Sequence, residues 1–411
     1  MSVRHRVGAV LSVVVIAVSL ASPAEAAPGV FVLDGRGGTS GRTMHAIGAD
    51  TANAVFEGDL FVFYEDATSG NLRMGRRTDR WAFRTLDGAG GTNGRVNADV
   101  GSDVAAAPYG GALHVFYRDE TGGNLRHGSF DGTTWAFETL DGVGGANGRL
   151  NADVGTSISV QTYRGSLFVF FVDRTHTNVR RARLSTGWTF STIDGAGGTG
   201  GRISGDVGYN TRAAVYDGTL HVFYFFQDPF CDPEFGCRLF GTIRQASFTP
   251  AAGWTASDVS NLNCCFEDLS LAVAKVSDSS VWLLYQNFGL HSTNLRHLHW
   301  NGASWVEETS NGFVEEAPAD GESVGGGASA LVFDGRPYVF YFGAGNFLGP
   351  PDGVRQAFWN GSTFVVANIG VSFGHPTSSR VRAGLRLVFM GDATIPEDEF
   401  GAHDLVQARL G

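Results

Sequence analysis

"ALHVFYRDETGGNLRHGSFDGTTWAFETLDG", residues 112–142, decides the fold, because close variants of it stand one repeat earlier and one repeat later. The earlier variant is LFVFYEDATSGNLRMGRRTDRWAFRTLDG (60–88), and the later one is LFVFFVDRTHTNVRRARLSTGWTFSTIDG (167–195). Repetition at a fixed spacing indicates an array of similar structural units. Aromatic and β-branched segments between Gly-rich turns predict strands, and no helical periodicity of useful length competes with them.

The unit recurs along the whole chain. The apolar core of its second strand recurs at steps of 53, 54, 53, 61, 56 and 49 residues, which gives seven units. In the quoted unit we expect four strands, near 103–109, 112–119, 124–130 and 134–140. Four short antiparallel strands per unit predict an all-β fold, a seven-bladed β-propeller of four-stranded blades. The seven cores are Val62-Phe63-Tyr64, Val115-Phe116-Tyr117, Val169-Phe170-Phe171, Val222-Phe223-Tyr224, Leu283-Leu284-Tyr285, Val339-Phe340-Tyr341 and Val388-Phe389-Met390.

The two ends of the repeat array complement each other. The last unit ends in DLVQARLG, after its third strand, whereas residues 28–35, PGVFVLDG, are in phase with the end of a fourth strand. We therefore expect residues 29–34 to complete the last blade, so that no sheet edge is left at the seam. This arrangement predicts one propeller domain over residues 27–411.

Residues 1–26 have the pattern of a secretory signal peptide. Arg4 and Arg6 precede a mostly apolar run from Val7 to Leu20, and Ala24-Glu25-Ala26 matches a cleavage site. The run is too short for a membrane span, and no later run is longer. The sequence thus predicts a secreted, extracellular protein without a membrane span.

Charge and cysteine content narrow the classes of partner and site. A formal net charge of −11 without a basic run disfavours nucleic-acid binding. An even number of cysteines in an oxidising compartment favours disulfides over a metal site. Pairing within the first two, or from them to the last two, is open; the four are Cys231, Cys237, Cys264 and Cys265.

Loop length distinguishes the two faces of the predicted propeller. From the second-strand core to the third-strand arginine the chain runs 11 residues in the first three units, then 22, 13 and 16, and it runs 19 residues to Gln407 in the last unit. All the extra residues fall in loops between the second and third strands, which share one face. Elaborated loops on a rigid scaffold commonly carry binding, so we expect a ligand on this face.

A series of carboxylates is predicted on the same face. They stand 15 to 17 residues before the second-strand core in five units, where the innermost strands open at the mouth of the central channel. A partial carboxylate ring could bind Ca²⁺ or a cationic or polyhydroxylated ligand. The alternative is that each one caps its own turn or pairs with a neighbouring arginine. We include His403 of the last unit in this candidate ligand site, with Asp99, Asp153, Asp206, Asp268 and Glu322.

Two further residue types recur with the scaffold and therefore predict structural roles. An arginine in the third strand recurs in six units, which favours an interblade partner over six binding sites. A tryptophan that opens the fourth strand recurs in five units, and core packing at the blade edge is its expected role. These residues are Arg73, Arg126, Arg180, Arg244, Arg296 and Arg355, with Trp81, Trp135, Trp188, Trp254 and Trp305.

The segment LHVFYRDETGGNLRHGSFDGTTW (113–135) resembles the repeat of fucose-binding propeller lectins and of the related bacterial PLL-type lectins. The resemblance covers nearly all of residues 27–411 and implies a propeller with a general glycan-binding role. In such lectins an arginine on the second strand and a glutamate on the third hold the sugar between blades. That pair is missing here in every unit, where the quoted one has His114 and His127, so the resemblance does not imply fucose.

Three functions remain open from the sequence. The first is a secreted carbohydrate-binding propeller for a glycan or other small extracellular ligand, without a required cofactor. The second is an extracellular polysaccharide lyase or glycoside hydrolase with one site at the channel mouth, where Asp206 and Asp268 could act as acid and base and His375 or His403 as a base. The third is a protein-interaction propeller. No G-x-S-x-G or H-E-x-x-H motif is present, so no catalytic residue is assigned, and the oligomeric state is open.

Overall fold

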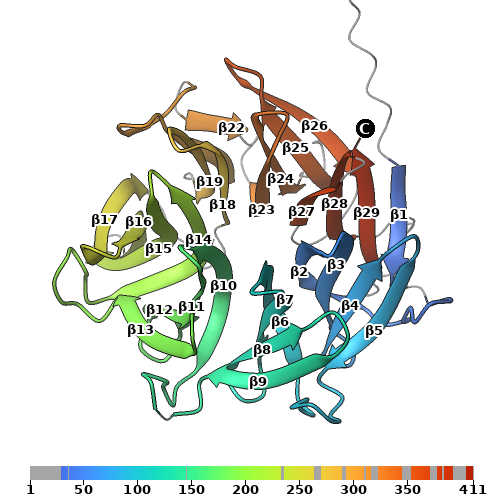
Figure 1. The fold of residues 1–411 in the computed structure, drawn as a ribbon. Coiled ribbons are helices and arrows are strands. Elements are labelled where there is room, and N and C mark those ends of the chain that lie inside the picture. The colour runs from blue at the N-terminus through green and yellow to red at the C-terminus, as the bar shows by residue number, and fades with distance from the viewer. Residues whose placement is uncertain are drawn as a thin grey trace, which may run out of the picture.

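The β-sheets form a ring around a central axis (Figure 1). The computed structural model describes residues 29–35, 37–144, 146–232, 236–262, 270–288, 293–309, 312–315, 323–344, 353–370, 377–381, 384–391 and 404–410. Within these ranges, nearly all regular structure is β-strand, and no helix is long and apolar enough to cross a membrane. The all-β propeller prediction is therefore confirmed as a class of fold.

The first four sheets each have four antiparallel strands in chain order. The first contains β2 (Ile47–Phe56), β3 (Asp59–Asp66), β4 (Asn71–Arg77) and β5 (Trp81–Asp87). The second contains β6 (Val100–Tyr109), β7 (Ala112–Asp119), β8 (Asn124–Phe130) and β9 (Trp135–Asp141). The third contains β10 (Val154–Tyr163), β11 (Ser166–Asp173), β12 (Asn178–Leu184) and β13 (Trp188–Asp194). The fourth contains β14 (Asp206–Tyr216), β15 (Thr219–Asp232), β16 (Gly236–Thr249) and β17 (Gly253–Leu262).

The predicted count of seven blades is wrong, because the described strands form six sheets. The fifth and sixth sequence units share one sheet of nine strands, which one parallel pair, Thr293 with Ser323, joins. The outer strand of the fifth unit consists of two short pieces, and neither of them pairs with Thr293, the first residue of the third strand. Thr293 pairs instead with the sixth unit. The nine strands are β18 (Leu271–Ser277), β19 (Ser280–Phe288), β20 (Thr293–Trp300), β21 (Trp305–Val306), β22 (Phe313–Glu315), β23 (Ser323–Phe333), β24 (Arg336–Ala344), β25 (Gly353–Trp359) and β26 (Phe364–Gly370).

The last sheet contains the closing strand that the two ends of the repeat array predict. Its order is β1-β29-β28-β27, so the first strand of the chain is its outer strand beside β29 (Figure 1). The register runs antiparallel from Gly29 opposite Arg409 to Val32 opposite Val406. These strands are β27 (Thr377–Val381), β28 (Gly384–Gly391), β29 (Asp404–Leu410) and β1 (Gly29–Asp34).

The hydrophobic core lies between neighbouring sheets. Leu113, Val115, Phe116 and Tyr117 of β7 are completely buried, because both faces of the strand are covered, which explains why the strand reads as a continuous apolar run. The alternate residues of that strand contribute to two clusters, one shared with the first sheet and one with the third. Trp135 stacks on Phe130 and Phe137 at the blade edge, as predicted for the recurrent tryptophans.

A buried ion pair ties each of several sheets to the strand that precedes it. Asp87, at the end of β5, accepts hydrogen bonds from the Tyr117 hydroxyl (2.6 Å) and from the Arg126 guanidinium (Nε, 3.0 Å), both in the second sheet. Its other oxygen accepts the amides of Gly88 (2.9 Å) and Val96 (2.7 Å). Burial, and then the Asp87 carboxylate, raise the pKa of Tyr117 well above its usual range, so the hydroxyl stays protonated and donates.

The same connection recurs for four more of the third-strand arginines and confirms the interblade role predicted for them, whereas Arg296 binds Glu307 of its own unit at 2.8 Å. The carboxylate partners come from the preceding outer strand, and the third sheet has Phe171 in place of the tyrosine. The further pairs are Arg73 with Asp34, Arg180 with Asp141, Arg244 with Asp194 and Arg355 with Glu315.

Candidate functional site: a polar pocket on the propeller axis

Each of three innermost strands carries a bulge at the same repeat position. The strand registers shift around Asp103 of β6, Ser157 of β10 and Asn210 of β14, and these residues have φ values of 49°, 53° and 54°. Left-handed backbone is uncommon outside glycine, although Asp and Asn tolerate it better than most residues. A bulge inserts a residue and redirects a side chain, and here it exposes polar groups to the axis.

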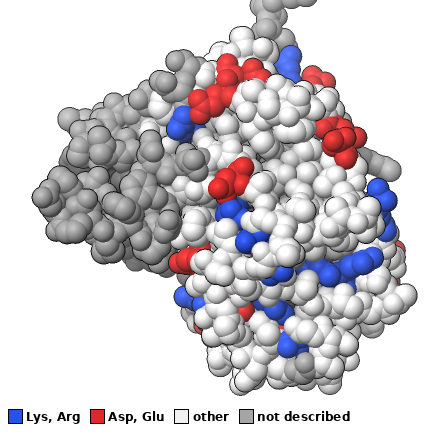
Figure 2. Space-filling view, turned by 90° about the vertical axis from the view of Figure 1, so that its left-hand side faces the viewer, with Lys and Arg blue, Asp and Glu red and all other residues white. Residues whose placement is uncertain are grey.

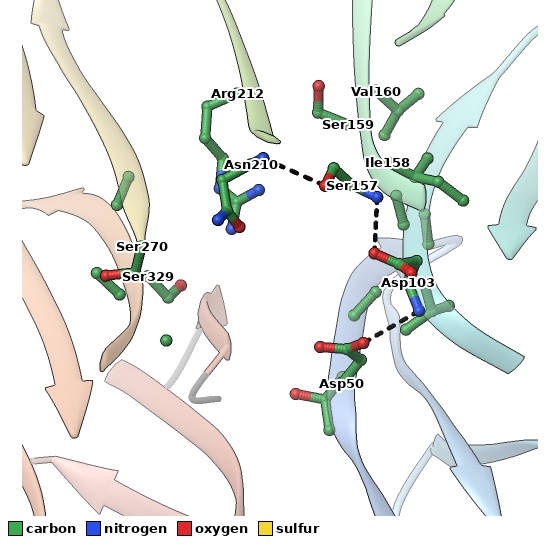
Figure 3. Close-up of a pocket in the computed structure, with 18 of the residues that line it drawn as sticks. Asp50, Asp103, Ser157, Ile158, Ser159, Val160, Asn210, Arg212, Ser270 and Ser329 are labelled. Carbon is green, nitrogen blue, oxygen red and sulfur yellow. Dashed lines mark hydrogen bonds between the residues drawn. The ribbon is translucent and has the colours of Figure 1, made fainter. Parts of the chain in front are cut away.

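The bulges are linked in series across the sheets. The Asp103 amide donates to Asp50 Oδ2 (3.1 Å), and the Ser157 amide donates to Asp103 Oδ1 (2.7 Å). The Asn210 amide then donates to Ser157 Oγ (3.2 Å), so four sheets are joined by side chains that also face the pocket (Figure 3). These contacts orient the side chains before any ligand arrives.

The inner strands enclose a pocket of about 740 Å³. This volume lies in the range of about 300–1,000 Å³ that is usual for small-molecule sites. Small apolar residues such as Ala106 and Ala328 form part of its wall and leave room on the axis. Its polar lining includes Asp50, Asp103, Ser159, Asn210, Arg212 and Ser329.

The charges in the pocket are of both signs. Burial, and then the neighbouring Asp50 carboxylate, raise the pKa of Asp103 to about 7, although the Ser157 amide opposes the shift. Burial lowers the pKa of Arg212, while Asp50 and Asp103 oppose that change. Arg212 lies across the pocket from the two carboxylates (Figure 3) and donates from Nη1 to the Thr211 carbonyl (2.8 Å).

The predicted aspartates with described side chains are dispersed rather than gathered, and none of the three lines the pocket. Asp153 accepts a hydrogen bond from Arg118 Nη1 at 2.7 Å, and Asp206 accepts from the Tyr209 hydroxyl at 3.2 Å. Asp99 is exposed, and its amide donates to Thr121 Oγ1 at 3.0 Å. Their role as ligand groups remains a prediction.

Asp99 does belong to a group of acids beside the channel. Burial, followed by the charges of Asp99 and Asp50, raises the pKa of Glu65 to about 7. Glu65 occupies the position that Arg118 has in the next sheet, where the arginine binds Asp153 instead. At this position the first sheet therefore has a carboxyl group beside Asp99, whereas the second sheet has an ion pair between Arg118 and Asp153.

The remaining predicted residues cannot be placed. Asp268, Glu322, His375, His403, Cys264 and Cys265 lie outside the described residues. Cys231 and Cys237 are opposite each other in the β15–β16 register, but their side chains are outside the described part, so their pairing remains a prediction. Among the residues that can be searched, no group of three His, Cys, Asp or Glu could hold a metal ion.

Sequence reasoning missed Asp50, Asp103 and Arg212. The first two stand 12 residues before the second-strand core of their units, where Ser157 and Asn210 stand in the next two. Counting residues back from the second-strand core, as was done for Asp99, would therefore also have found this recurrent polar position. That these residues face the axis could not be read from strand alternation, because the bulge adds a residue to the strand.

Comparison with known proteins supports the fold and leaves the family open. No family model matches the chain, and no curated protein matches it. A polysaccharide lyase of family PL25, an ulvan lyase bound to -[GlcA(1-4)Rha3S]-, superposes with a TM-score of 0.56 at 11% identity, over 89% of this chain and 94% of that one. Polysaccharide lyase Uly1 superposes with a TM-score of 0.54 at 12% identity, over 90% and 91%. A fucose-specific lectin from Aleuria aurantia reaches only 0.41 at 14% identity, over 79% and 96%, which is too low to support the lectin family.

Proposed function

We propose that this protein binds carbohydrate in the axial pocket. The observation that carries the proposal is a cavity of about 740 Å³ in which hydroxyl, amide, carboxylate and guanidinium groups converge from six innermost strands. The hydroxyl groups of a polyhydroxylated ligand can donate hydrogen bonds to the carboxylates and accept them from the guanidinium group. The two polysaccharide lyases of similar fold support a carbohydrate ligand by analogy only.

The lining differs from sheet to sheet, and this argues for one ligand per chain. The bulge position is aspartate in the first two sheets, Asp50 and Asp103, but Ser157 in the third and Asn210 in the fourth. A multivalent lectin with a sugar between blades would instead keep the same residues in each repeat. We infer an asymmetric site with one orientation of the bound sugar.

A glycan array tests the proposal. We expect the chain to bind a defined set of oligosaccharides, and the double variant Asp50→Asn, Asp103→Asn to lose that binding while it stays folded. Asp334→Asn, in the exposed hairpin between β23 and β24, is the matched control and should bind as the parent does. The array is run with and without Ca²⁺ to test the predicted cation. Failure to bind any glycan, or full binding by the double variant, would reject the proposal.

A hydrolytic role is a second candidate, and one observation favours it. Asp103 has a pKa near neutrality beside a second carboxylate, which is how a general acid is set apart from its partner in glycosidases. Release of reducing sugar from the glycans that bind would support this role. Asp103→Asn should then abolish turnover and retain binding. Binding without turnover in the parent chain would leave the protein a binder.

We also propose that the protein acts outside the cell, which rests on the pattern of residues 1–26 alone. The expected mature N-terminus is near Ala27. Mass spectrometry of the protein recovered from culture medium tests this, and an intact N-terminus in the cytosolic fraction would contradict it.

A further inference from the structure

A second cleft lies between the first and second sheets, away from the axis. Two cavities of about 220 and 230 Å³ share Arg84 of β5 and Thr133 of the β8–β9 hairpin. The first cavity also includes Arg76, and the second includes Arg95, Thr92 and Asn93. We call this site the arginine cleft.

Only one of the three guanidinium groups in the arginine cleft has a carboxylate partner within the described residues. Arg76 binds Asp59 at 2.6 Å, but Arg84 has no hydrogen bond or ion pair within the described residues. Arg95 Nε is buried without a partner. Partial burial, followed by the charges of Arg76 and Arg95, lowers the pKa of Arg84. Arg84 is therefore a positive charge without a carboxylate partner, in a chain whose net charge is −11.

The second sheet provides an internal comparison at the same ladder position. Arg84 is opposite Met74, whereas in the second sheet Glu138 is opposite His127 and accepts a hydrogen bond from it at 2.9 Å. In the second sheet the two side chains of this pair thus bind each other, whereas Arg84 in the first sheet faces an apolar side chain.

The third sheet repeats the unpaired cation. Here the cation is on the third strand: Arg181 of β12 is equivalent to Met74 and His127 and stands opposite Ser191, and its Nε and Nη1 are buried without a partner. The guanidinium lies over Phe168, as does that of Arg183. Figure 2 faces the side of the ring where the third and fourth sheets lie in Figure 1, and shows basic side chains with a few acidic ones across its lower half.

Three acids lie near the arginine cleft. The Glu57 carboxylate lies beside Gly132 of the first cavity, but it forms no ion pair with Arg76, Arg84 or Arg95. Asp59 is already paired with Arg76. The Asp131 carboxylate accepts from the amides and hydroxyls of Thr133 and Thr134 at 2.7–3.0 Å, which satisfies it locally. A group with several acceptor oxygens would accept hydrogen bonds from the unpaired guanidinium N–H groups. Arginine is suited to bind such a group through paired N–H donors.

We propose that the arginine cleft binds an oxyanion, the carboxylate or sulfate ester of an acidic sugar. Arg84 supplies the principal contact, and Arg95 and the polar side chains around Thr133 flank the anion. This site is separate from the axial pocket, and its existence does not rest on the function proposed for that pocket.

Calorimetric titration of the full chain with simple sugars tests the proposal. Glucuronate, galactose 6-sulfate, inorganic sulfate, glucose and galactose are the probes. We expect at least one acidic sugar to bind, glucose and galactose not to bind in the cleft, and Arg84→Gln to weaken the acidic sugar by about tenfold or more. Which acidic sugar binds distinguishes a carboxylate site from a sulfate-ester site.

The second sheet supplies matched controls. Arg149→Gln, the loop counterpart of Arg95 beside the neutralised pair, should leave the affinity unchanged. His127→Met with Glu138→Arg places a pair like Met74 and Arg84 in the next interface, where Ser129 stands in place of Arg76, and should add a weaker binding site. No binding of any anion, equal binding by Arg84→Gln, or equal affinity for inorganic sulfate and the acidic sugars would overturn the proposal. Loss of neutral-glycan binding at the axis would reject the other proposal and leave this one intact.

Discussion

At the scale of single residues, the contacts around Asp87 give the clearest consequence for stability. Arg126 and Asp87 are both buried, with 2.9 Å between Nη2 and Oδ2. Arg126→Met removes one charge and leaves the other buried with only neutral donors, Tyr117 and two amides. Breaking a buried pair from one side typically costs about 3–5 kcal/mol. We expect a loss of that size in the free energy of unfolding, measured by urea denaturation.

The control for this variant is an ion pair on the surface. Lys275 and Asp278 are 2.7 Å apart with side chains 38% and 66% exposed. Asp278→Asn should leave the free energy of unfolding nearly unchanged, because solvent screens an exposed pair. Equal losses in Arg126→Met and Asp278→Asn would contradict the role assigned to the buried pair.

Asp103 predicts how stability depends on pH. Its pKa is about 7 in the folded chain, against about 3.9 for an unperturbed aspartate. Between these two pH values the folded state keeps a proton that the unfolded state has released, so stability should fall as pH rises. Asp103→Asn should flatten this fall between pH 4 and 7, with Glu65 retaining part of it. An unchanged slope in denaturation curves across this range would contradict the assignment.

At the scale of elements, β1 closes the ring with six residues. Deleting residues 29–34 exposes the edge of β29 and removes Asp34, which accepts from the Tyr64 hydroxyl at 2.6 Å and binds Arg73 at 2.9 Å. We expect the truncated chain to lose about 3 kcal/mol or more. An excess of a peptide with residues 28–35 should restore its melting temperature by strand addition. The same peptide with Asp34→Ala should restore less; equal rescue would contradict the role of Asp34.

The long β15–β16 hairpin carries the cysteine prediction. The register places Cys231 opposite Cys237, which favours a bond within the hairpin over a bond to Cys264 or Cys265. Peptide mapping without reduction should recover residues 231 and 237 in one linked fragment. A fragment linking residue 231 to 264 or 265 would show the other connectivity.

Individual strands show how much of the fold could be predicted from the sequence. The predicted strands 112–119 and 124–130 coincide with β7 and β8, because aromatic alternation and Gly turns set both limits. The count of seven blades failed at the fifth unit, where β21 has only two residues and β20 pairs with β23 instead. That exchange depends on a contact between units, which a repeat pattern does not contain.

At the scale of the whole molecule, a repeated scaffold surrounds a lining that does not repeat. Residues that recur, such as Arg126 and its equivalents, proved structural, and the repeat itself predicted that role. At the bulge position the axial pocket takes aspartate from the first two sheets, Asp50 and Asp103, but Ser157 and Asn210 from the next two. The pocket could not be predicted from the repeat, because the bulges that expose these residues depend on hydrogen bonds between sheets.

The most direct test of the account is the stoichiometry of binding. The neutral oligosaccharide that binds most tightly in the array is titrated by calorimetry into the parent chain and into the variants Arg212→Met and Arg164→Met. Arg164 is exposed in a hairpin, so its variant serves as the control. The axial pocket predicts one site per chain, affinity about tenfold or more weaker in Arg212→Met, and no change in Arg164→Met. Several equivalent sites per chain, or unchanged affinity in Arg212→Met, would contradict the account.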